Sequence, residues 1–365
     1  MSFDDILALR QRIDAINGQM LGLLSERGDL VRRIGAIKTR EGLEKFDPLR
    51  ESEELEALLP SNRGPFDDAT VRYLFTEIFR ASLDLMEHQE AEVLKVSRRH
   101  KQADTVFSVG GAVFGGPEPV VVAGPCSVES EEQVRRVAAA MAQAGAKVLR
   151  GGAFKPRTSP YAFQGLGAKG YEILARVARE FGLVSVSEVM EVAAIPMAES
   201  IDILQVGARN MSNFKLLEAV GKSGKPVLLK RGLAATCEEF LLAAEYLIAG
   251  TGRIVLCERG IRTFERWTRN TLDISAVPLL TMQSHLPVIV DVSHAAGRTD
   301  ILVPLARAAV AAGAHGVMVE VHPAPAFALS DQTQQIDLAA FAEFAKAVKE
   351  AGAAYRTHSA RSSQG

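Results

Sequence analysis

The sequence lacks three features that would point to a secreted, membrane-bound or nucleic-acid-binding protein. Its three cysteines, Cys126, Cys237 and Cys257, are too few and too scattered for a disulfide framework. No run of about 18 apolar residues occurs, and residues 1–30 carry charges throughout in place of an apolar signal core. The formal net charge of −2 gives no excess of positive charge for nucleic acid or an anionic membrane. We therefore expect a cytoplasmic protein.

The first ninety residues have helical periodicity. Apolar residues recur at helical spacing from Phe3 to Lys38, which predicts one long helix, and two further helices are predicted over 47–59 and 67–97. At about 1.5 Å per residue the first helix would extend roughly 50 Å, too long to bury its apolar stripe against itself. The pattern predicts an all-helical domain over 1–90 that forms a homodimer.

The rest of the chain alternates short apolar runs with longer helical stretches. Residues 91–118 are interpreted as a linker able to form a short hairpin from 105–109 and 112–114. Eight β-branched runs follow, at 120–123, 147–149, 183–187, 203–206, 227–229, 254–256, 288–290 and 317–319. Eight strands with intervening helices suit an α/β TIM barrel, (β/α)8, better than an open sheet. We expect the barrel over 119–352 and a C-terminal tail over 353–365.

Charged or reactive side chains follow every predicted strand. Residues 150–161 form the densest group, with glycines and prolines that shape the loop and with the cations and hydroxyls Arg150, Lys155, Arg157, Thr158 and Ser159. The other strand ends carry Cys126, Glu188, Arg209, Lys230, Arg231, Glu258, Arg259, Asp291, His294, Glu320 and His322, with Asp331 beyond. Because the carboxyl ends of barrel strands meet at one rim, this pattern predicts a single pocket for phosphate and carboxylate groups.

Four residues of that rim could hold one metal ion. Cys126, His294, Glu320 and Asp331 would supply a thiolate, an imidazole and two carboxylates. This mixed set favours a divalent transition ion, Mn, Fe, Co or Zn, over magnesium, and the ligands alone do not name the ion. The alternative is that Cys126 is a small buried core residue and His294 a hydrogen-bonded rim histidine.

The barrel motifs resemble those of 3-deoxy-arabino-heptulosonate 7-phosphate (DAHP) synthases of the type I beta class. They are Gly-Pro-Cys-Ser at 124–127, Leu-Arg-Gly-Gly-Ala-Phe-Lys-Pro-Arg-Thr-Ser-Pro-Tyr at 149–161, Gly-Ala-Arg-Asn at 207–210, Leu-Lys-Arg-Gly at 229–232, Cys-Glu-Arg-Gly-Ile-Arg at 257–262 and Val-Glu-Val-His-Pro at 319–323. The resemblance implies a metal-dependent condensation of phosphoenolpyruvate with erythrose 4-phosphate, the first step of the shikimate pathway to aromatic amino acids.

The same resemblance implies roles for individual residues. It assigns phosphoenolpyruvate to Arg150, Lys155, Arg209, Lys230 and Arg259, erythrose 4-phosphate to Arg157, Thr158 and Ser159, and the metal to Cys126, His294, Glu320 and Asp331. Lys155 is the expected proton carrier, since arginine effectively does not donate a proton. A barrel of the 3-deoxy-octulosonate phosphate synthase type is the alternative, and the 155–159 loop favours the four-carbon sugar phosphate.

The helical domain resembles the all-helical chorismate mutases, through Leu9-Arg10, Ile13-Asp14, Glu26-Arg27, Lys38 and the stretch 47–51. Arg27 occupies a heptad position otherwise filled by apolar residues, and Lys38 lies within about 20° of it around the helix. The resemblance implies that chorismate or prephenate binds Arg10 from the partner subunit and Arg27, Lys38, Asp47, Arg50 and Ser82. Fixed cations suffice for a pericyclic rearrangement, because it needs no nucleophile.

One position departs from the mutase pattern. Four residues after Ser82 that family has Gln or Glu in contact with the ether oxygen of the substrate, whereas this chain has Met86. A thioether is a weak acceptor and no donor, so one contact is lost unless Gln89 replaces it. Two interpretations of the helical domain follow, and they can hold together: the protein is bifunctional and this domain converts chorismate to prephenate, weakly or not, or the domain is chiefly a regulatory module that binds chorismate or prephenate and inhibits the barrel. Both allow feedback regulation, with a homotetramer as the expected assembly.

Overall fold

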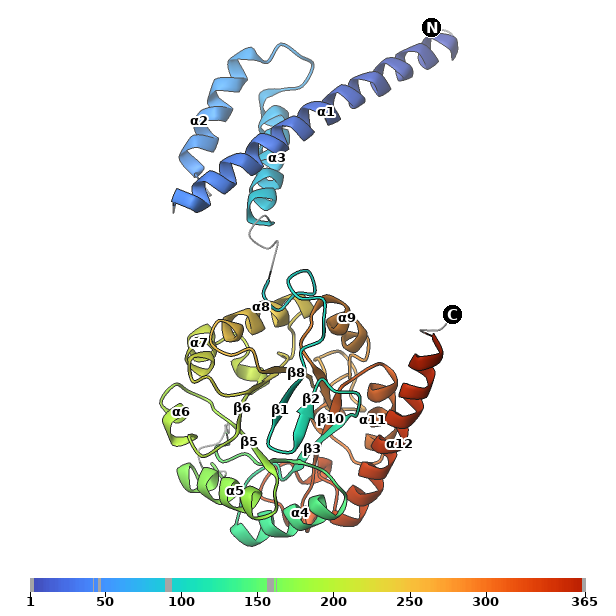
Figure 1. Ribbon diagram of the computed structural model, residues 1–365. Coiled ribbons are helices and arrows are strands. Elements are labelled where there is room, and N and C mark those ends of the chain that lie inside the picture. The colour runs from blue at the N-terminus through green and yellow to red at the C-terminus, as the bar shows by residue number, and fades with distance from the viewer. Residues whose placement is uncertain are drawn as a thin grey trace. The chain divides into compact units, whose positions relative to one another are not determined.

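The structure is a computed structural model that describes residues 3–41, 43–44, 47–88, 94–155, 161 and 163–362. The chain divides into two compact units, Met1–Val93 and Leu94–Gly365. The first is made of helices and the second is a barrel of strands surrounded by helices (Figure 1). None of the helices in the described ranges is both long and apolar enough to cross a membrane.

The described part of the helical unit holds three α-helices and one short 3₁₀ turn: α1 Phe3–Glu41, α2 Pro48–Leu58, η1 Leu59–Ser61 and α3 Asp68–His88. Helix α2 begins where Asp47 accepts a hydrogen bond from Arg50 N at 3.2 Å, an N-cap followed by proline at the first helical turn. Val31 of α1 and Phe79 of α3 are buried. Helix α1 nevertheless exposes apolar side chains along most of its length, namely Ile6, Leu7, Leu9, Ile13, Ile16, Met20, Leu21, Leu23, Leu24, Leu30, Ile34 and Ile37.

The third helix is shorter than the sequence predicts. Residues 94–97, which we expected at the end of that helix, form a turn and a bridge in which Ser97 pairs with Ser284. Val96 is fully buried in the barrel core, and Ser284 Oγ donates a 2.6 Å hydrogen bond to its carbonyl. The prediction for 94–97 was wrong, because apolar spacing does not show whether a residue continues a helix or already belongs to the next folded unit.

Eight parallel strands close into a barrel, which confirms the predicted fold class. The strands are β3 Val120–Gly124, β4 Val148–Arg150, β5 Val184–Glu188, β6 Ile203–Val206, β7 Val227–Lys230, β8 Ile254–Glu258, β9 Val288–Asp291 and β10 Gly316–Glu320. Their order around the barrel is β10-β3-β4-β5-β6-β7-β8-β9, so each strand pairs with its sequence neighbours and β10 closes on β3. All their carboxyl ends therefore lie at one rim.

Helices surround the barrel, as Figure 1 shows. They are α4 Glu131–Gln143, α5 Ala168–Glu180, α6 Ala194–Met197, α7 Phe214–Lys222, α8 Cys237–Ile248, α9 Ala276–Gln283, α10 Val292–Ala296, α11 Leu302–Ala311 and α12 Leu338–Ser362, with the 3₁₀ turns η3 Ala208–Asn210, η4 Pro325–Phe327 and η5 Gln332–Gln334. Helix α8 starts with a capping box between Thr236 and Glu239. Helix α12 continues through residues 353–362, where the sequence suggested a tail.

A hairpin closes the amino-terminal end of the barrel. Strands β1 Phe107–Val109 and β2 Ala112–Phe114 pair antiparallel, as predicted, and the rings of Phe107 and Phe114 stack with centroids 5.4 Å apart. Ala112 and Phe114 are buried in one cluster with the side chains that fill the barrel, among them Val122, Val148 and Ile289. The hairpin leaves the opposite rim as the open end.

Residues 95–105 are tied to helices of the barrel rather than forming a loose linker. The backbone N–H groups of Lys95 and Val96 donate to the two carboxylate oxygens of Glu245 at 3.0 and 3.1 Å. His285 Nε2 lies 2.7 Å from Lys95 O, and its Nδ1 lies 2.7 Å from Thr105 Oγ1. Because a carbonyl only accepts, Nε2 donates to it, and in the neutral imidazole Nδ1 accepts from the Thr105 hydroxyl.

We expect the barrel to lose stability as the pH falls through His285 titration. Burial lowers the pKa of His285 below its usual value near 6.5. The unfolded chain then binds a proton more readily than the folded one below about pH 6.5, so the free energy of unfolding falls with pH there. Urea unfolding of the wild type and of His285→Gln at about pH 7.5 and about pH 5.5 measures this, and the wild type should lose more stability. Equal losses in the two proteins would contradict the assignment.

Candidate active site

A pocket of about 270 Å³ opens at the carboxyl ends of the barrel strands. Among the residues that the structure describes, seven cationic side chains line it: Arg150, Lys155, Arg209, Lys230, Arg259, Arg262 and Arg269. Glu188, Gln205, Asn270, His294 and Asp331 complete its polar lining. The structure thus brings together all five cations that the sequence assigned to phosphoenolpyruvate. Arg157, Thr158 and Ser159 lie outside the described residues.

Arg150 and Lys155 lie at the inner wall of the pocket. Arg150 is 2% exposed, and its Nη1 donates to Glu320 Oε1 at 2.5 Å. Lys155 Nζ donates to Cys126 Sγ at 3.1 Å. Gly152 permits this approach, because a Cβ at that position would lie 2.7 Å from both Lys155 Nζ and Cys126 O. The glycine in the loop therefore lets the lysine lie across the backbone and reach the thiol.

The remaining cations divide into paired and unpaired groups. Lys230 forms a buried ion pair with Asp291. Arg231, which does not line the pocket, pairs with Glu258 at 2.9 Å and Asp273 at 2.8 Å. Arg259 is 6% exposed, and its buried Nη1 has no hydrogen-bond partner among the described residues. Burial lowers the pKa of Arg259. A buried guanidinium with a free donor is unfavourable unless an anion binds it, so this side chain favours an anionic ligand.

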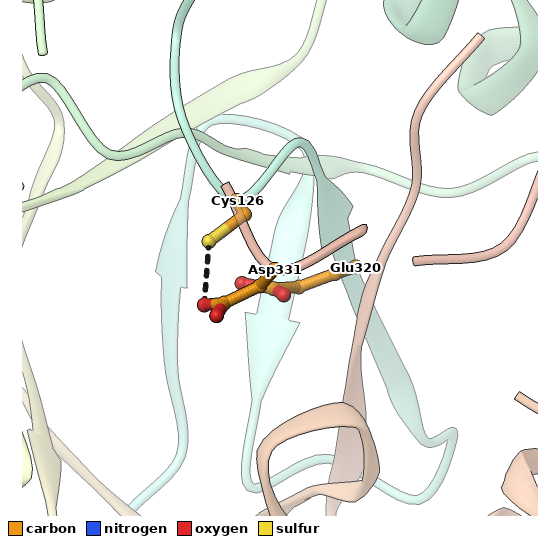
Figure 2. Close-up of side chains that lie close together, drawn as sticks. All are labelled: Cys126, Glu320 and Asp331. Carbon is orange, nitrogen blue, oxygen red and sulfur yellow. Dashed lines mark hydrogen bonds between the residues drawn. The ribbon is translucent and has the colours of Figure 1, made fainter. Parts of the chain in front are cut away.

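Three of the predicted metal ligands form a compact cluster. Cys126 follows β3, Glu320 ends β10, and Asp331 lies on the loop before α12; their ligand atoms all lie within 4.8 Å of one another. Figure 2 shows the three side chains converging, with the hydrogen bond from Cys126 Sγ to Asp331 Oδ2 of 3.1 Å drawn between them. Asp331 has left-handed backbone angles, with φ of 47°, unusual for a residue other than glycine.

Burial and neighbouring charges shift the pKa values of the cluster residues. Burial, and after it the nearby Glu320 carboxylate, raise the pKa of the Cys126 thiol to about 11, although the charges of Lys155 and Arg150 act in the opposite direction. For Glu320 burial acts in the same upward direction, but the charges of His294, Arg150 and Lys155 outweigh it and lower its pKa to about 2. Glu320 is therefore ionised at neutral pH. The thiol keeps its proton unless a cation displaces it.

His294, the fourth predicted ligand, lies next to Glu320 but outside the compact cluster. Its Nδ1 is 2.8 Å from Asp291 Oδ2, and its Nε2 is 3.5 Å from Glu320 Oε1. The compact group of ligand atoms contains Cys126, Glu320 and Asp331 but not His294. Burial lowers the pKa of His294, which favours the neutral imidazole that a metal requires. The donor set of sulfur, nitrogen and carboxylate oxygen fits a divalent transition ion.

The helical unit brings two of its predicted site residues into contact. Arg27 Nη1 donates to Ser82 Oγ, and the guanidinium carbon lies 5.2 Å from the centre of the Phe79 ring. Asp47 and Arg50 meet at the start of α2, and Lys38 lies half-buried on α1. Arg10 is exposed on α1, about 25 Å along the helix from Arg27, at 1.5 Å per residue. Met86 lies in α3, but its side chain and Gln89 are outside what the structure describes.

Several pocket residues were not predicted from the sequence. Arg262, Arg269 and Asn270 come from the long segment after β8, and Gln205 precedes the Gly-Ala-Arg-Asn motif. Arg262 is the last residue of the Cys-Glu-Arg-Gly-Ile-Arg motif at 257–262, so its position after a strand could have predicted that it lines the pocket. No signal in the sequence pointed to Arg269 or Asn270. Their positions depend on tertiary contacts, because Arg269 donates to Gln334 and Asn270 donates to the carbonyl of His294.

The closed barrel, its cation-lined pocket and its buried thiol–carboxylate cluster define an α/β-barrel enzyme. The chain belongs to the DAHP synthetase I family, whose model matches residues 96–357. The chorismate mutase type II family model matches residues 9–87. Both resemblances seen in the sequence are thereby confirmed.

Individual relatives agree with this placement. A phospho-2-dehydro-3-deoxyheptonate aldolase from Thermotoga maritima is 48% identical over 322 residues, which cover 85% of this chain and 94% of that protein. A crystal structure of a protein of that name (DAHP synthase) from the same organism matches with a TM-score of 0.69 and 52% identity, covering 71% of this chain and 76% of that one. A 2-dehydro-3-deoxyphosphooctonate aldolase from Syntrophobacter fumaroxidans is 34% identical over 253 residues, 64% of this chain and 86% of that protein.

Proposed function

We propose that the barrel condenses phosphoenolpyruvate with erythrose 4-phosphate to give DAHP and inorganic phosphate. The observation that carries the proposal is the set of seven cations around one pocket beside a buried thiol–carboxylate cluster. Two phosphates and a carboxylate must be bound together in this reaction, and arginine and lysine donors match those oxygens. The identity of 48% to a protein named for the same product supports it.

The residues at the barrel rim divide the chemistry of this reaction between them. The reaction joins the enol carbon of phosphoenolpyruvate to the aldehyde carbon, transfers a proton to the aldehyde oxygen, adds water at the carbon bearing the phosphate ester and releases phosphate. Arg150, Arg259 and Lys230 bind and orient the phosphoenolpyruvate anion. Lys155, at the inner wall beside Cys126, supplies the proton. Arg157, Thr158 and Ser159 bind the second phosphate, as their match to the family motif implies.

Cys126, His294, Glu320 and Asp331 would hold the divalent ion. When bound, it would supply Lewis-acid polarisation of the aldehyde or activation of the attacking water. The buried position of Glu320 and the neutral state favoured for His294 suit both residues as ligands. Manganese, iron, cobalt and zinc all match the donor set.

The choice of sugar phosphate separates the two related activities. The protein named 2-dehydro-3-deoxyphosphooctonate aldolase matches at 34% identity, against 48% for the heptonate aldolase. An eight-carbon product built from the three carbons of phosphoenolpyruvate requires a five-carbon sugar phosphate. Phosphoenolpyruvate consumption measured with each sugar phosphate should show a clear preference for erythrose 4-phosphate. A preference for the five-carbon sugar would overturn the proposal.

We propose that the helical unit binds chorismate or prephenate and regulates the barrel, with mutase turnover that is weak. Arg27 and Ser82 are in contact, so a carboxylate bound there would meet a guanidinium and a hydroxyl side by side. The exposed apolar side chains of α1 would be covered by a second copy of the helix. Because Arg10 lies about 25 Å from Arg27 on the same helix, it would serve the partner's site rather than its own.

Met86→Gln should raise chorismate mutase turnover. A glutamine amide at this position would donate to the ether oxygen, where charge develops in the transition state, and such a donor is worth about 10² to 10³ in rate. Conversion of chorismate to prephenate, followed by absorbance in the wild type and the variant, measures the gain. Met86→Leu is the matched control and should leave turnover at the wild-type level. An unchanged rate in Met86→Gln would mean that another residue already makes the contact.

A further inference from the structure

Two adjacent glutamines lie directly behind the proposed metal ligands. Gln334 and Gln335 are 1% and 2% exposed, although both lie on the irregular segment between β10 and α12. The backbone fixes them beside Glu320, because Ile336 N donates to Glu320 O at 3.0 Å and His322 N donates to Ile336 O at 2.9 Å. Amide side chains this deeply buried need hydrogen-bond partners, and each has two.

Gln334 connects a proposed ligand to a pocket arginine. Its Nε2 donates to Glu320 Oε2 at 2.6 Å, and its Oε1 accepts from Arg269 Nη1 at 2.7 Å. The other oxygen of Glu320, Oε1, faces Arg150 at 2.5 Å and His294 at 3.5 Å. Gln334 therefore determines the rotation of the Glu320 carboxylate. It binds Oε2, which leaves Oε1 directed toward Arg150 and His294.

Gln335 connects the two loops that carry the other ligands. Its Oε1 accepts from the backbone N–H of Cys126 at 3.0 Å, and its Nε2 donates to the carbonyl of Ser330 at 2.7 Å. Ser330 immediately precedes Asp331, whose left-handed backbone angles need support from its surroundings. One side chain thus fixes the residue before Asp331 relative to the backbone of Cys126, although the two ligands are far apart in the sequence.

We infer that Gln334 and Gln335 are positioning residues of the metal site, which hold Glu320, Cys126 and Asp331 in place for the ion without binding it. The inference rests on the metal site of the proposed function. Both polar atoms of each amide are already engaged in hydrogen bonds to other residues, so the amides support the ligands from behind. Partners behind metal ligands orient those ligands, and their loss weakens metal affinity by about 10- to 100-fold.

The test is a titration of the full-length metal-free protein with Co²⁺, whose bond to a thiolate gives a charge-transfer absorption band. Methionine matches glutamine in length and removes both hydrogen bonds. We expect Gln334→Met and Gln335→Met each to weaken Co²⁺ affinity by about 10- to 100-fold. The charge-transfer band should change its position in Gln335→Met, because this variant loses the hydrogen bond to the Cys126 backbone. The band should keep its position in Gln334→Met, because this variant loses a hydrogen bond to the Glu320 carboxylate and not to the thiolate ligand.

A third glutamine of the same segment is the matched control. Gln332 is exposed and donates to Ala328 O at 2.8 Å, away from the ligands. Gln332→Met should bind Co²⁺ as the wild type does. The two test variants act on different ligands, so either one suffices if the other fails to fold, as circular dichroism would show. Wild-type affinity in the folded test variants would overturn the inference. A wild-type protein without a thiolate band would instead overturn the metal site itself.

Discussion

Cys126→Ser should weaken binding of a divalent transition ion by more than about 100-fold, because it replaces a ligand and not merely a partner behind one. Serine is nearly the same size, so the fold should be retained. The hydroxyl is a harder donor than the thiolate and does not ionise near neutral pH. Calorimetric titration with Mn²⁺ or Zn²⁺ measures the affinity. Synthase activity at stoichiometric metal should fall in parallel and recover partly at a large excess of metal.

Cys237→Ser is the matched control for this experiment. Cys237 is half-buried at the start of α8 and is absent from both the pocket lining and the ligand cluster. We expect its variant to bind metal and turn over as the wild type does. If Cys126→Ser binds metal with unchanged affinity, Cys126 is a buried core residue and the cluster is not a metal site.

Arg27→Ala should weaken binding of chorismate and prephenate by about 10- to 150-fold, the range expected when a hydrogen bond to a charged group is lost. Arg27 donates to Ser82 and lies over the Phe79 ring, in the helical unit. Inhibition of the synthase by prephenate should weaken to the same degree, since the response requires that the ligand bind. Synthase activity without prephenate should not change.

Arg33 provides the comparison, because it is an exposed arginine on the same helix with no predicted role in the site. Arg33→Ala should retain both binding and inhibition. Binding by isothermal titration and inhibition by initial rates are measured on the same preparations. Should prephenate still bind tightly to Arg27→Ala, the ligand site lies elsewhere and the proposed role of the helical unit is lost.

The fold was predictable from the sequence because each barrel element has a strong local signal. All eight β-branched runs form strands, and the hairpin forms where Gly110, with a φ of 52°, allows the turn between β1 and β2. The end of α3 was not predictable, since Val96 already belongs to the barrel unit and is buried in the core of that unit. Helical spacing does not reveal which surface an apolar residue meets.

The site residues that could be predicted from the sequence are those that end a strand or directly follow one. Arg150, Lys230, Arg259 and Glu320 end strands or follow them at once, so barrel geometry alone brings them together. Gln334 and Gln335 lie well beyond β10 in a polar segment that looks like an exposed loop in the sequence. Only the folded chain shows that this segment returns against Glu320 and Cys126 and buries both amides.

The most direct test of the account is a steady-state assay of the metal-loaded protein with phosphoenolpyruvate and erythrose 4-phosphate, with and without prephenate, alongside chorismate turnover in the same preparation. The account predicts phosphate release coupled to DAHP formation, loss of that activity on chelation, inhibition by prephenate and slow chorismate turnover. Absence of DAHP formation with any of the four candidate metals would contradict its central claim.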